Sequence, residues 1–447
     1  MSNTWFRLRR GFFLSFFPSD TPHYENVPFE LPNSWVWCRL EDIAYVASGS
    51  TPDKTCFVEN GVPYIKMYNL RNQKIDFAYH PQYITEEVHN GKLQRSRTEV
   101  GDLIMNIVGP PLGKLAIIPT TLPQANFNQA AVLIRPYKFK EVLVSYLKVY
   151  LEEMSEINSI ATRGSAGQVN ISLTQSQNMR IPIPPLNEVR RIIEEVSKYD
   201  ILIDSLKQNI TDIQNLIAYT KSKILDLAIH GKLVPQDPND EPAIELLKRI
   251  NPDFTPCDNG HYTFDVPSGW ITTNLGSIFN VVSAKRILKS DWKHSGVPFY
   301  RAREIAKLSI YGLVDNELYI SEEHYNSLKE KFPVPKASDI MISAVGTIGK
   351  CYIVKESDKF YYKDASVLCL CNDYQINAKY IYHIMRSEYM LKQMYDNSKG
   401  TTVDTITIEK AKQYILPLPP LAEQQRIVQK IEELFSVLDN IQNALEV

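Results

Sequence analysis

The sequence of 447 residues lacks any apolar run approaching the roughly 20 residues that a membrane-spanning helix requires. Hydrophobic residues make up 44% and charged residues 22%, which is typical of a globular chain and excludes a disordered or fibrous one. The 49 basic and 51 acidic side chains nearly cancel, and the formal net charge is −2. This balance excludes a strongly basic protein as a whole, although one part of the chain can still carry a basic surface.

Cysteine is scarce, and none of the six residues falls in a C-x-x-C spacing; they are Cys38, Cys56, Cys257, Cys351, Cys369 and Cys371. We therefore predict free thiols rather than a zinc site or a disulfide framework. The start of the chain has three arginines before a short apolar run at residues 12–17, but no small-x-small cleavage site follows. This pattern argues against a secretory signal, and we predict a cytoplasmic protein.

Catalytic motifs are also missing. The sequence contains no phosphate-binding G-x-x-x-x-G-K-[ST], no G-x-G-x-x-G, no H-E-x-x-H and no G-x-S-x-G. Residues 109–114 and 346–350 are glycine-rich, but they lack the length and the Ser or Thr of a phosphate loop, so we interpret them as tight turns between strands. The eight histidines are dispersed, which disfavours metal binding. These absences predict a binding protein without a catalytic site, a metal or a cofactor.

An internal repeat organises the chain. The segment Pro-Ile-Pro-Pro-Leu at residues 182–186 returns as Pro-Leu-Pro-Pro-Leu at residues 417–421, an offset of 235 residues. Residues 101–105 match residues 338–342 with a slip of two positions. A period of this length with so few gaps indicates a tandem duplication of a whole domain together with its connector.

Each copy has a globular part and a helical part. Short apolar runs broken by Gly, Pro and Asn predict a mixed α/β domain of about 150 residues. Apolar residues then recur in steps of three and four from Val189 to Leu227, and again from Ile427 to Leu445, which predicts two long helices with matching seams and an intramolecular coiled coil. We expect an atypical segment at residues 1–22, a first globular domain at 23–185, a helical region and linker at 186–261, a second globular domain at 262–420 and a C-terminal helical region at 421–447.

Loops that combine bases, amides and aromatics are the candidate binding surface. Arg and Lys can pair with guanine and with phosphates, while Asn and Gln can bind adenine edges. The candidates are Lys66, Tyr68, Asn69, Arg71, Arg163, Ser165, Gln168 and Asn170 in the first copy, and Arg301, Arg303, Lys350, Lys399, Thr401 and Thr402 in the second. The same composition is also typical of solvated polar loops, which is the alternative. Because the scaffold matches while polar positions differ between copies, each copy is expected to bind a different target.

The organisation resembles the specificity subunit of type I restriction–modification enzymes. The most specific passage is Ile-Leu-Asp-Leu-Ala-Ile-His-Gly-Lys-Leu-Val-Pro-Gln at residues 224–236, which is similar to the central helical region of that family. The proline-rich entries to both helices are equally similar. The resemblance covers nearly the whole chain from about Val27 onward.

This resemblance implies an α+β protein in which two α/β target-recognition domains are separated and bridged by long antiparallel coiled-coil helices. Each domain would read one half of a split double-stranded DNA target, and the helices would fix the spacer between the halves. The implied partners are methyltransferase subunits and, through the complex, motor–nuclease subunits. The ATP, magnesium and S-adenosylmethionine of such complexes are expected to bind elsewhere.

The chain departs from the family pattern at both ends. Residues 421–447 match only residues 186–212, and residues 1–22 contain nothing similar to the Gly-Lys-Leu-Val-Pro of residues 231–235. We therefore expect docking of a second methyltransferase to be affected. Two other classes remain open: a single-chain restriction or methyltransferase enzyme, which would need motifs absent from this sequence, and a scaffold that binds only protein.

Overall fold

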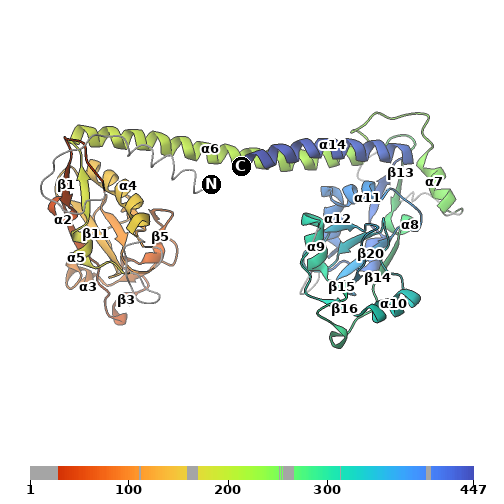
Figure 1. Cartoon of the computed structure of the whole chain (residues 1–447), viewed down its shortest axis with the longest axis horizontal. Helices are drawn as coiled ribbons and strands as arrows, with labels where there is room; N and C mark the ends of the chain where they lie inside the picture. The colour runs from red at the N-terminus through yellow and green to blue at the C-terminus, as the bar shows by residue number, and fades with distance from the viewer. Residues whose placement is uncertain are drawn as a thin grey trace. The chain divides into compact units, whose positions relative to one another are not determined.

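The computed structural model describes residues 29–109, 112–158, 170–250, 252, 254, 266–312, 314–398 and 404–446. The chain divides into two compact units, Met1–Ser205 (unit 1) and Leu206–Val447 (unit 2), which are described separately (Figure 1). Among the described residues, no helix combines the length and apolar character needed to cross a membrane.

Unit 1 is built on a four-stranded antiparallel sheet. Its apolar runs form strands because they are buried from both sides; Ala131 to Ile134, for example, are each fully buried. The strand order is β2 (Ala44–Ser48), β11 (Ala131–Pro136), β8 (Leu103–Asn106) and β9 (Leu115–Ile117).

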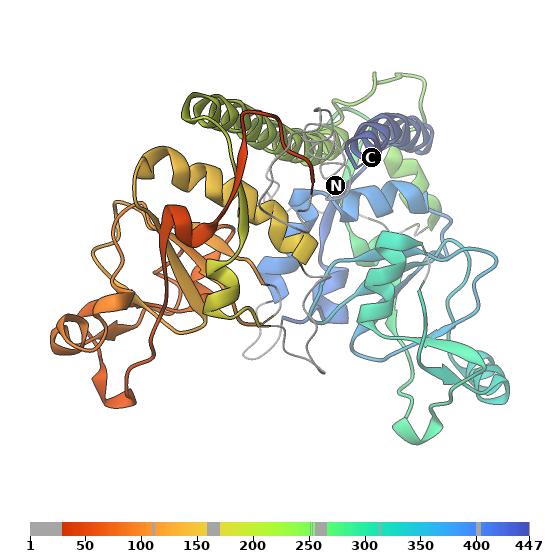
Figure 2. The same ribbon diagram turned by 60° about the vertical axis from the view of Figure 1, so that its left-hand side comes forward.

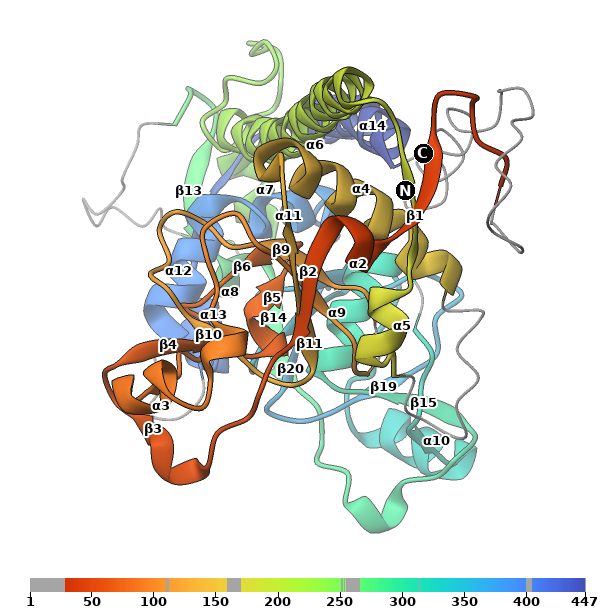
Figure 3. The same ribbon diagram turned by 90° about the vertical axis from the view of Figure 1, so that its left-hand side faces the viewer.

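The two faces of this sheet carry different layers. Met105 and Val132 point to the face covered by α4 (Lys140–Asn158) and by the start of α6 (Leu186–Ile229). Figures 2 and 3 show α4 between α6 and the strands. Their sequence neighbours point to the opposite face, as the alternation of a strand requires. On this opposite face the chain forms a smaller sheet. Its strand order is β10 (Asn126–Phe127), β4 (Val62–Ile65), β7 (Tyr83–Ile84) and β3 (Phe57–Val58).

A two-stranded ribbon carries the chain from this domain into the long helix. Strand β1 (Val36–Arg39) pairs antiparallel with β12 (Arg180–Ile183), and α6 begins three residues after β12. The remaining helices of unit 1 are short: α2 (Leu40–Ile43), α3 (Glu86–Asn90) and α5 (Leu173–Gln177).

Unit 2 repeats this plan, in agreement with the predicted duplication. Its four-stranded sheet has the order β14 (Asn280–Ser283), β20 (Val367–Cys371), β17 (Ile340–Ser343) and β18 (Cys351–Ile353). A smaller sheet has the order β16 (Tyr319–Ile320), β15 (Val297–Tyr300) and β19 (Tyr361–Tyr362), and the ribbon pairs β13 (Ile271–Asn274) with β21 (Ile415–Leu418). The helices are α7 (Ala243–Ile250), α8 (Leu275–Ile278), α9 (Ala302–Tyr311), α10 (Glu322–Lys331), α11 (Ala378–Met385), α12 (Glu388–Ser398), α13 (Ile408–Lys412) and α14 (Leu421–Leu445).

The units differ in the segment after β4 in unit 1 and after its counterpart β15 in unit 2. In unit 1 this segment forms a hairpin of β5 (Leu70–Arg71) and β6 (Lys74–Ile75), whereas in unit 2 it forms helix α9. The predicted candidate residues 66–71 and 301–303 lie in these two segments. A shared scaffold therefore carries different local structures at the predicted binding loops.

Within unit 2, the last part of α6 packs antiparallel on α14 (Figure 1). Ala228 of α6 shares an apolar core with Ile427 and Ile431 of α14, and Lys221 forms an ion pair with Asp439. The higher-numbered α6 residue, Ala228, packs with lower-numbered residues of α14, whereas Lys221 pairs with the higher-numbered Asp439. The two helices are therefore antiparallel. The seam of α6 is buried at the end of the helix, but Leu206 is 52% exposed. The predicted antiparallel helical pair is confirmed, and its observed packing involves the C-terminal part of α6.

Candidate nucleic-acid interface

A tight turn positions the first candidate residues of unit 1. Lys66 follows β4 and precedes the 3₁₀ helix η2 (Met67–Asn69), and its backbone N–H donates to Asn69 Oδ1 at 2.9 Å. The Asn69 side chain donates in turn to the carbonyls of Asp76 (3.2 Å) and Tyr79 (2.8 Å). Asn69 is only 1% exposed, and these bonds engage both its oxygen and its nitrogen. This buried side chain therefore connects the backbone at the start of the loop to the backbone at its end.

Aromatic and cationic side chains gather on the outside of this loop. The guanidinium of Arg71 lies 4.0 Å from the centroid of the Tyr79 ring, within the range of a cation–π interaction. Tyr68 Oη donates to the His80 carbonyl at 3.2 Å, and the rings of Tyr68 and Tyr79 meet edge to face at 6.3 Å. Burial raises the pKa of Tyr68, so its hydroxyl remains a hydrogen-bond donor at neutral pH. The loop therefore offers a cation beside aromatic rings.

The hairpin β5–β6 projects two bases on either side of a polar turn. Asn72 and Gln73 both have positive φ, 50° and 56°, which is the pattern of a two-residue type I′ turn. Asn adopts this conformation readily, whereas the Gln73 side chain is fixed by accepting a hydrogen bond from the Leu115 backbone N–H at 2.7 Å. Arg71 and Lys74 flank the turn and are both exposed. Leu115 is the first residue of β9, so the hairpin is attached at the β8–β9 end of the main sheet.

Asn170 lies at the same end of the sheet. It forms an isolated antiparallel bridge with Val108, just after β8, and it is exposed. The predicted residues Arg163, Ser165 and Gln168 lie outside the residues that the structure describes.

In unit 2, the two predicted arginines belong to an ion-pair network. Arg301 caps α9, and its guanidinium donates to Glu304 at 2.8 Å; Arg303 donates to Glu304 at 2.9 Å and to Glu317 at 2.8 Å. Burial of Glu304, which is 1% exposed, disfavours its ionisation, but hydrogen bonds from Arg301 and Arg303 outweigh burial and lower its pKa to about 2. These arginines fix the start of α9, and the Arg303 side chain is 52% exposed.

Lys350 ends the loop between β17 and β18, the counterpart of the β8–β9 loop. Its backbone N–H donates to Ser343 Oγ at 3.0 Å, and its side chain is exposed. Val345 of this loop bridges Thr405, as Val108 bridges Asn170 in unit 1. Lys399, Thr401 and Thr402 lie outside the described residues.

Two residues that were not predicted join the unit 1 surface, Lys74 and Tyr79. Lys74 could have been found from its sequence, because Arg71-Asn72-Gln73-Lys74 is a polar turn flanked by bases between short apolar runs. Tyr79 is 41% exposed and meets Arg71 only through the fold of the loop, and nothing in the local sequence indicates that contact.

The sequence model of a protein family described as the type I restriction modification DNA specificity domain matches two parts of the chain, residues 32–215 and 267–447. The chain belongs to this family. Two matches in tandem also agree with the internal repeat and with the repeated sheet topology of the units.

Curated relatives of the chain are specificity subunits of type I restriction enzymes. The EcoAI specificity subunit of a type I restriction enzyme from Escherichia coli is 25% identical over 492 residues, covering 93% of this chain and 80% of the relative. The EcoEI specificity subunit, also from Escherichia coli, is 24% identical and covers 94% of this chain and 80% of the relative. Among solved structures, one concerned with complex assembly and conformational transition of the type I R-M system contains a chain with a TM-score of 0.58 and 19% identity, covering 94% of both chains. That likeness supports the fold.

The predicted resemblance to specificity subunits is therefore confirmed. The relatives are specificity subunits of restriction enzymes, so the prediction of a specificity component rather than a catalytic chain is confirmed with it. The two alternatives, a single-chain enzyme and a protein-only scaffold, gain no support from these relatives.

Proposed function

We propose that this chain reads a split double-stranded DNA target for a type I restriction–modification complex. Unit 1 recognises one half of the target, unit 2 recognises the other, and α6 with α14 sets the unspecified spacer between them. The observation that supports this most is that the two units share one sheet topology but carry a hairpin in one and helix α9 in the other at the predicted binding loops. A shared scaffold with different binding loops is what two domains need in order to recognise different DNA sequences.

We also propose the recognition surface and the partners. In unit 1 the surface comprises the loop and hairpin around Arg71 together with Asn170, and we expect Arg163, Ser165 and Gln168 to contact DNA as well. In unit 2 it comprises the start of α9, Lys350 and the segment containing Lys399, Thr401 and Thr402. Methyltransferase subunits bind the helical region, motor–nuclease subunits join through the complex, and assembly takes place in the cytoplasm. The recognition domains are taken to span residues 23–185 and 262–420.

Exchanging one recognition domain tests this function. Residues 29–183 are replaced by the matching part of the EcoAI specificity subunit, leaving α6 and unit 2 unchanged, in cells that also produce the cognate methyltransferase. Sequencing of methylated genomic DNA should show a changed half-site, while the other half-site and the spacer length stay the same. The reciprocal exchange of residues 271–418 is the matched control and should change only the second half-site.

Two results would contradict the proposal. If the unaltered chain with its methyltransferase gives no sequence-specific methylation, the chain does not specify DNA targets. If either exchange alters both half-sites or the spacer length, the two units do not read DNA independently.

A further inference from the structure

Both units carry a buried aspartate directly before the third strand of the main sheet. Asp102 precedes β8 and is 0% exposed, and Asp339 precedes β17 and is 5% exposed. Each accepts a hydrogen bond from the backbone N–H three residues earlier, Glu99 at 2.7 Å and Lys336 at 2.8 Å. The same turn therefore buries a carboxylate at the same place in both units.

In unit 1, two cations neutralise this carboxylate. Arg135 contacts Asp102 at 2.7 Å, and Lys140 Nζ contacts it at 2.7 Å. Burying a carboxylate is costly unless a positive group accompanies it, and here both cations are supplied from β11 and the start of α4. Arg135 follows Ile134, which pairs with Leu103 of β8.

In unit 2, the equivalent cation is missing. Leu370 pairs with Ile340 of β17, so the next residue, Cys371, occupies the position of Arg135. Among the described residues Asp339 takes part in no ion pair, and its other hydrogen bonds come from the Asn372 backbone N–H at 2.8 Å and from the Cys369 thiol. Burial raises the pKa of Asp339. The arginine that faces the buried carboxylate in unit 1 is therefore replaced by a cysteine in unit 2.

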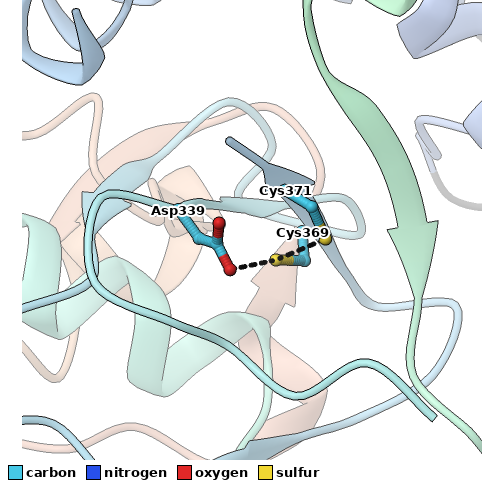
Figure 4. A group of neighbouring side chains, drawn as sticks. All are labelled: Asp339, Cys369 and Cys371. Carbon is cyan, nitrogen blue, oxygen red and sulfur yellow. Dashed lines mark hydrogen bonds between the residues drawn. The ribbon is translucent and has the colours of Figure 1, made fainter. Parts of the chain in front are cut away.

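A second thiol lies beside the first. Cys369 and Cys371 are two residues apart on β20, so both side chains point to the same face of the sheet. Their sulfur atoms are 3.8 Å apart, and Cys369 Sγ lies 3.8 Å from Asp339 Oδ2 (Figure 4). The ligand atoms of the three residues all lie within 4.8 Å of one another. Tetrahedral coordination with Zn–S about 2.3 Å and Zn–O about 2.1 Å requires S···S of about 3.8 Å and S···O of about 3.6 Å. The two distances from Cys369 Sγ are close to these values.

An unpartnered hydroxyl group is a separate observation at this place. Tyr362 is 1% exposed, belongs to the same apolar cluster as both cysteines, and its Oη has no hydrogen-bond partner among the described residues. Burial and then the neighbouring Cys369 and Cys371 raise its pKa. The corresponding residue of unit 1 is Phe127, because Phe127 ends the strand that pairs parallel with β4 and Tyr362 ends the strand that pairs parallel with β15. A buried hydroxyl without a partner is rare, and a bound ion would give it one.

We propose that Asp339, Cys369 and Cys371 bind a thiophilic divalent cation of the zinc class, with a neutral oxygen donor as the fourth ligand. The ion would bind directly to the buried carboxylate of unit 2, which in unit 1 is bound by Arg135 and Lys140 instead. On binding, the S–H bonds of both thiols break, two sulfur–metal bonds form, and the two protons pass to solvent. The role is structural, since the cluster also contains Ile305 and Leu308 of α9, and the ion would fix the sheet beneath that helix.

Cobalt substitution tests the proposal on the full-length chain. The protein is reduced with a phosphine, stripped with a chelator and titrated with Co²⁺ under inert gas. We expect thiolate-to-cobalt charge-transfer bands and the visible bands of a tetrahedral site to saturate at one equivalent per chain, and Zn²⁺ to abolish them. Cys369→Ser and Cys371→Ser should each lose these bands. The matched control Cys351→Ser, at a buried cysteine of β18 in the same sheet that packs in a different cluster, should keep them.

Thermal unfolding provides a second test of metal binding that does not depend on the visible absorption bands of cobalt. Zn²⁺ should raise the melting temperature of the unaltered chain and of Cys351→Ser but not that of Cys369→Ser. The unaltered chain decides the question even where a serine variant fails to fold. If it shows neither thiolate–cobalt bands nor zinc-dependent melting, or if the bands persist in both serine variants, the three residues do not bind metal.

Discussion

At the scale of single residues, the exposed hairpin of unit 1 offers the sharpest test of DNA contact. We expect Arg71→Ala and Lys74→Ala to weaken DNA binding by the assembled complex, because both side chains flank an exposed turn. Loss of a phosphate contact weakens binding to all sequences alike and lowers the salt slope by about one. Loss of a base contact costs about 1–3 kcal/mol and relaxes one position of the target. Measuring affinity at two salt concentrations on cognate and altered duplexes separates the two roles.

The control for these variants is Lys138→Ala. Lys138 is exposed and lies after β11, at the opposite end of the sheet from the β8–β9 loop. It should leave affinity and salt slope unchanged. Affinity within twofold of the unaltered chain for both hairpin variants would show that the hairpin is only a solvated loop.

Residue-scale roles were the part of the site least predictable from sequence. Lys66 and Arg71 were chosen because bases and aromatics alternate locally, and both do lie on the predicted loop. The same composition could not reveal that Asn69 is buried, or that Arg301 and Arg303 bind Glu304, since those contacts depend on how the loop or helix folds back. The cluster of Asp339 with Cys369 and Cys371 escaped the search for C-x-x-C spacing because its cysteines are spaced C-x-C and its carboxylate comes from the residue before a neighbouring strand.

At the scale of elements, sequence periodicity was more informative. The heptad steps predicted α6 and α14 because such helices are amphipathic along their whole length, and the repeat predicted that the two sheets would match. The difference between the β5–β6 hairpin and α9 could not be predicted in this way. The hairpin segment is short and polar, so its structure depends on contacts with the sheet, such as the hydrogen bond between Gln73 and Leu115.

The packing of α11 on α14 should depend on pH through His383. This residue is buried, and its ring meets Phe435 of α14 edge to face at 6.0 Å. Burial and then the nearby Arg386 lower its pKa from 6.5 to about 4, with Lys379 acting in the same direction and Glu432 opposing them. Between pH 6.5 and 4 the unfolded chain therefore binds a proton that the folded chain does not. The free energy of unfolding of unit 2 should fall as pH decreases through this window, by at most about 1.4 kcal/mol per pH unit for one proton.

Replacing His383 should remove this contribution. Melting curves of His383→Gln between pH 4 and 7 should show a shallower loss of stability than those of the unaltered chain. His294→Gln, at an exposed position of unit 2, is the matched control. Equal pH dependence in all three chains would mean that His383 does not couple folding to protonation.

At the scale of the whole molecule, the helical pair is expected to determine whether both half-sites are read together. Ile431 of α14 is fully buried in a core that also contains Leu225 and Ala228 of α6. Ile431→Asp places an unpaired charge there and should destabilise unit 2 by on the order of 3–5 kcal/mol. Val437→Asp makes the same chemical change on α14 at a position that is 55% exposed, and it should cost little. Calorimetry should show the difference in melting, and methylation sequencing should show loss of the fixed spacer only for Ile431→Asp. Equal melting and unchanged methylation in both variants would mean that α14 contributes neither to the core of unit 2 nor to the spacer.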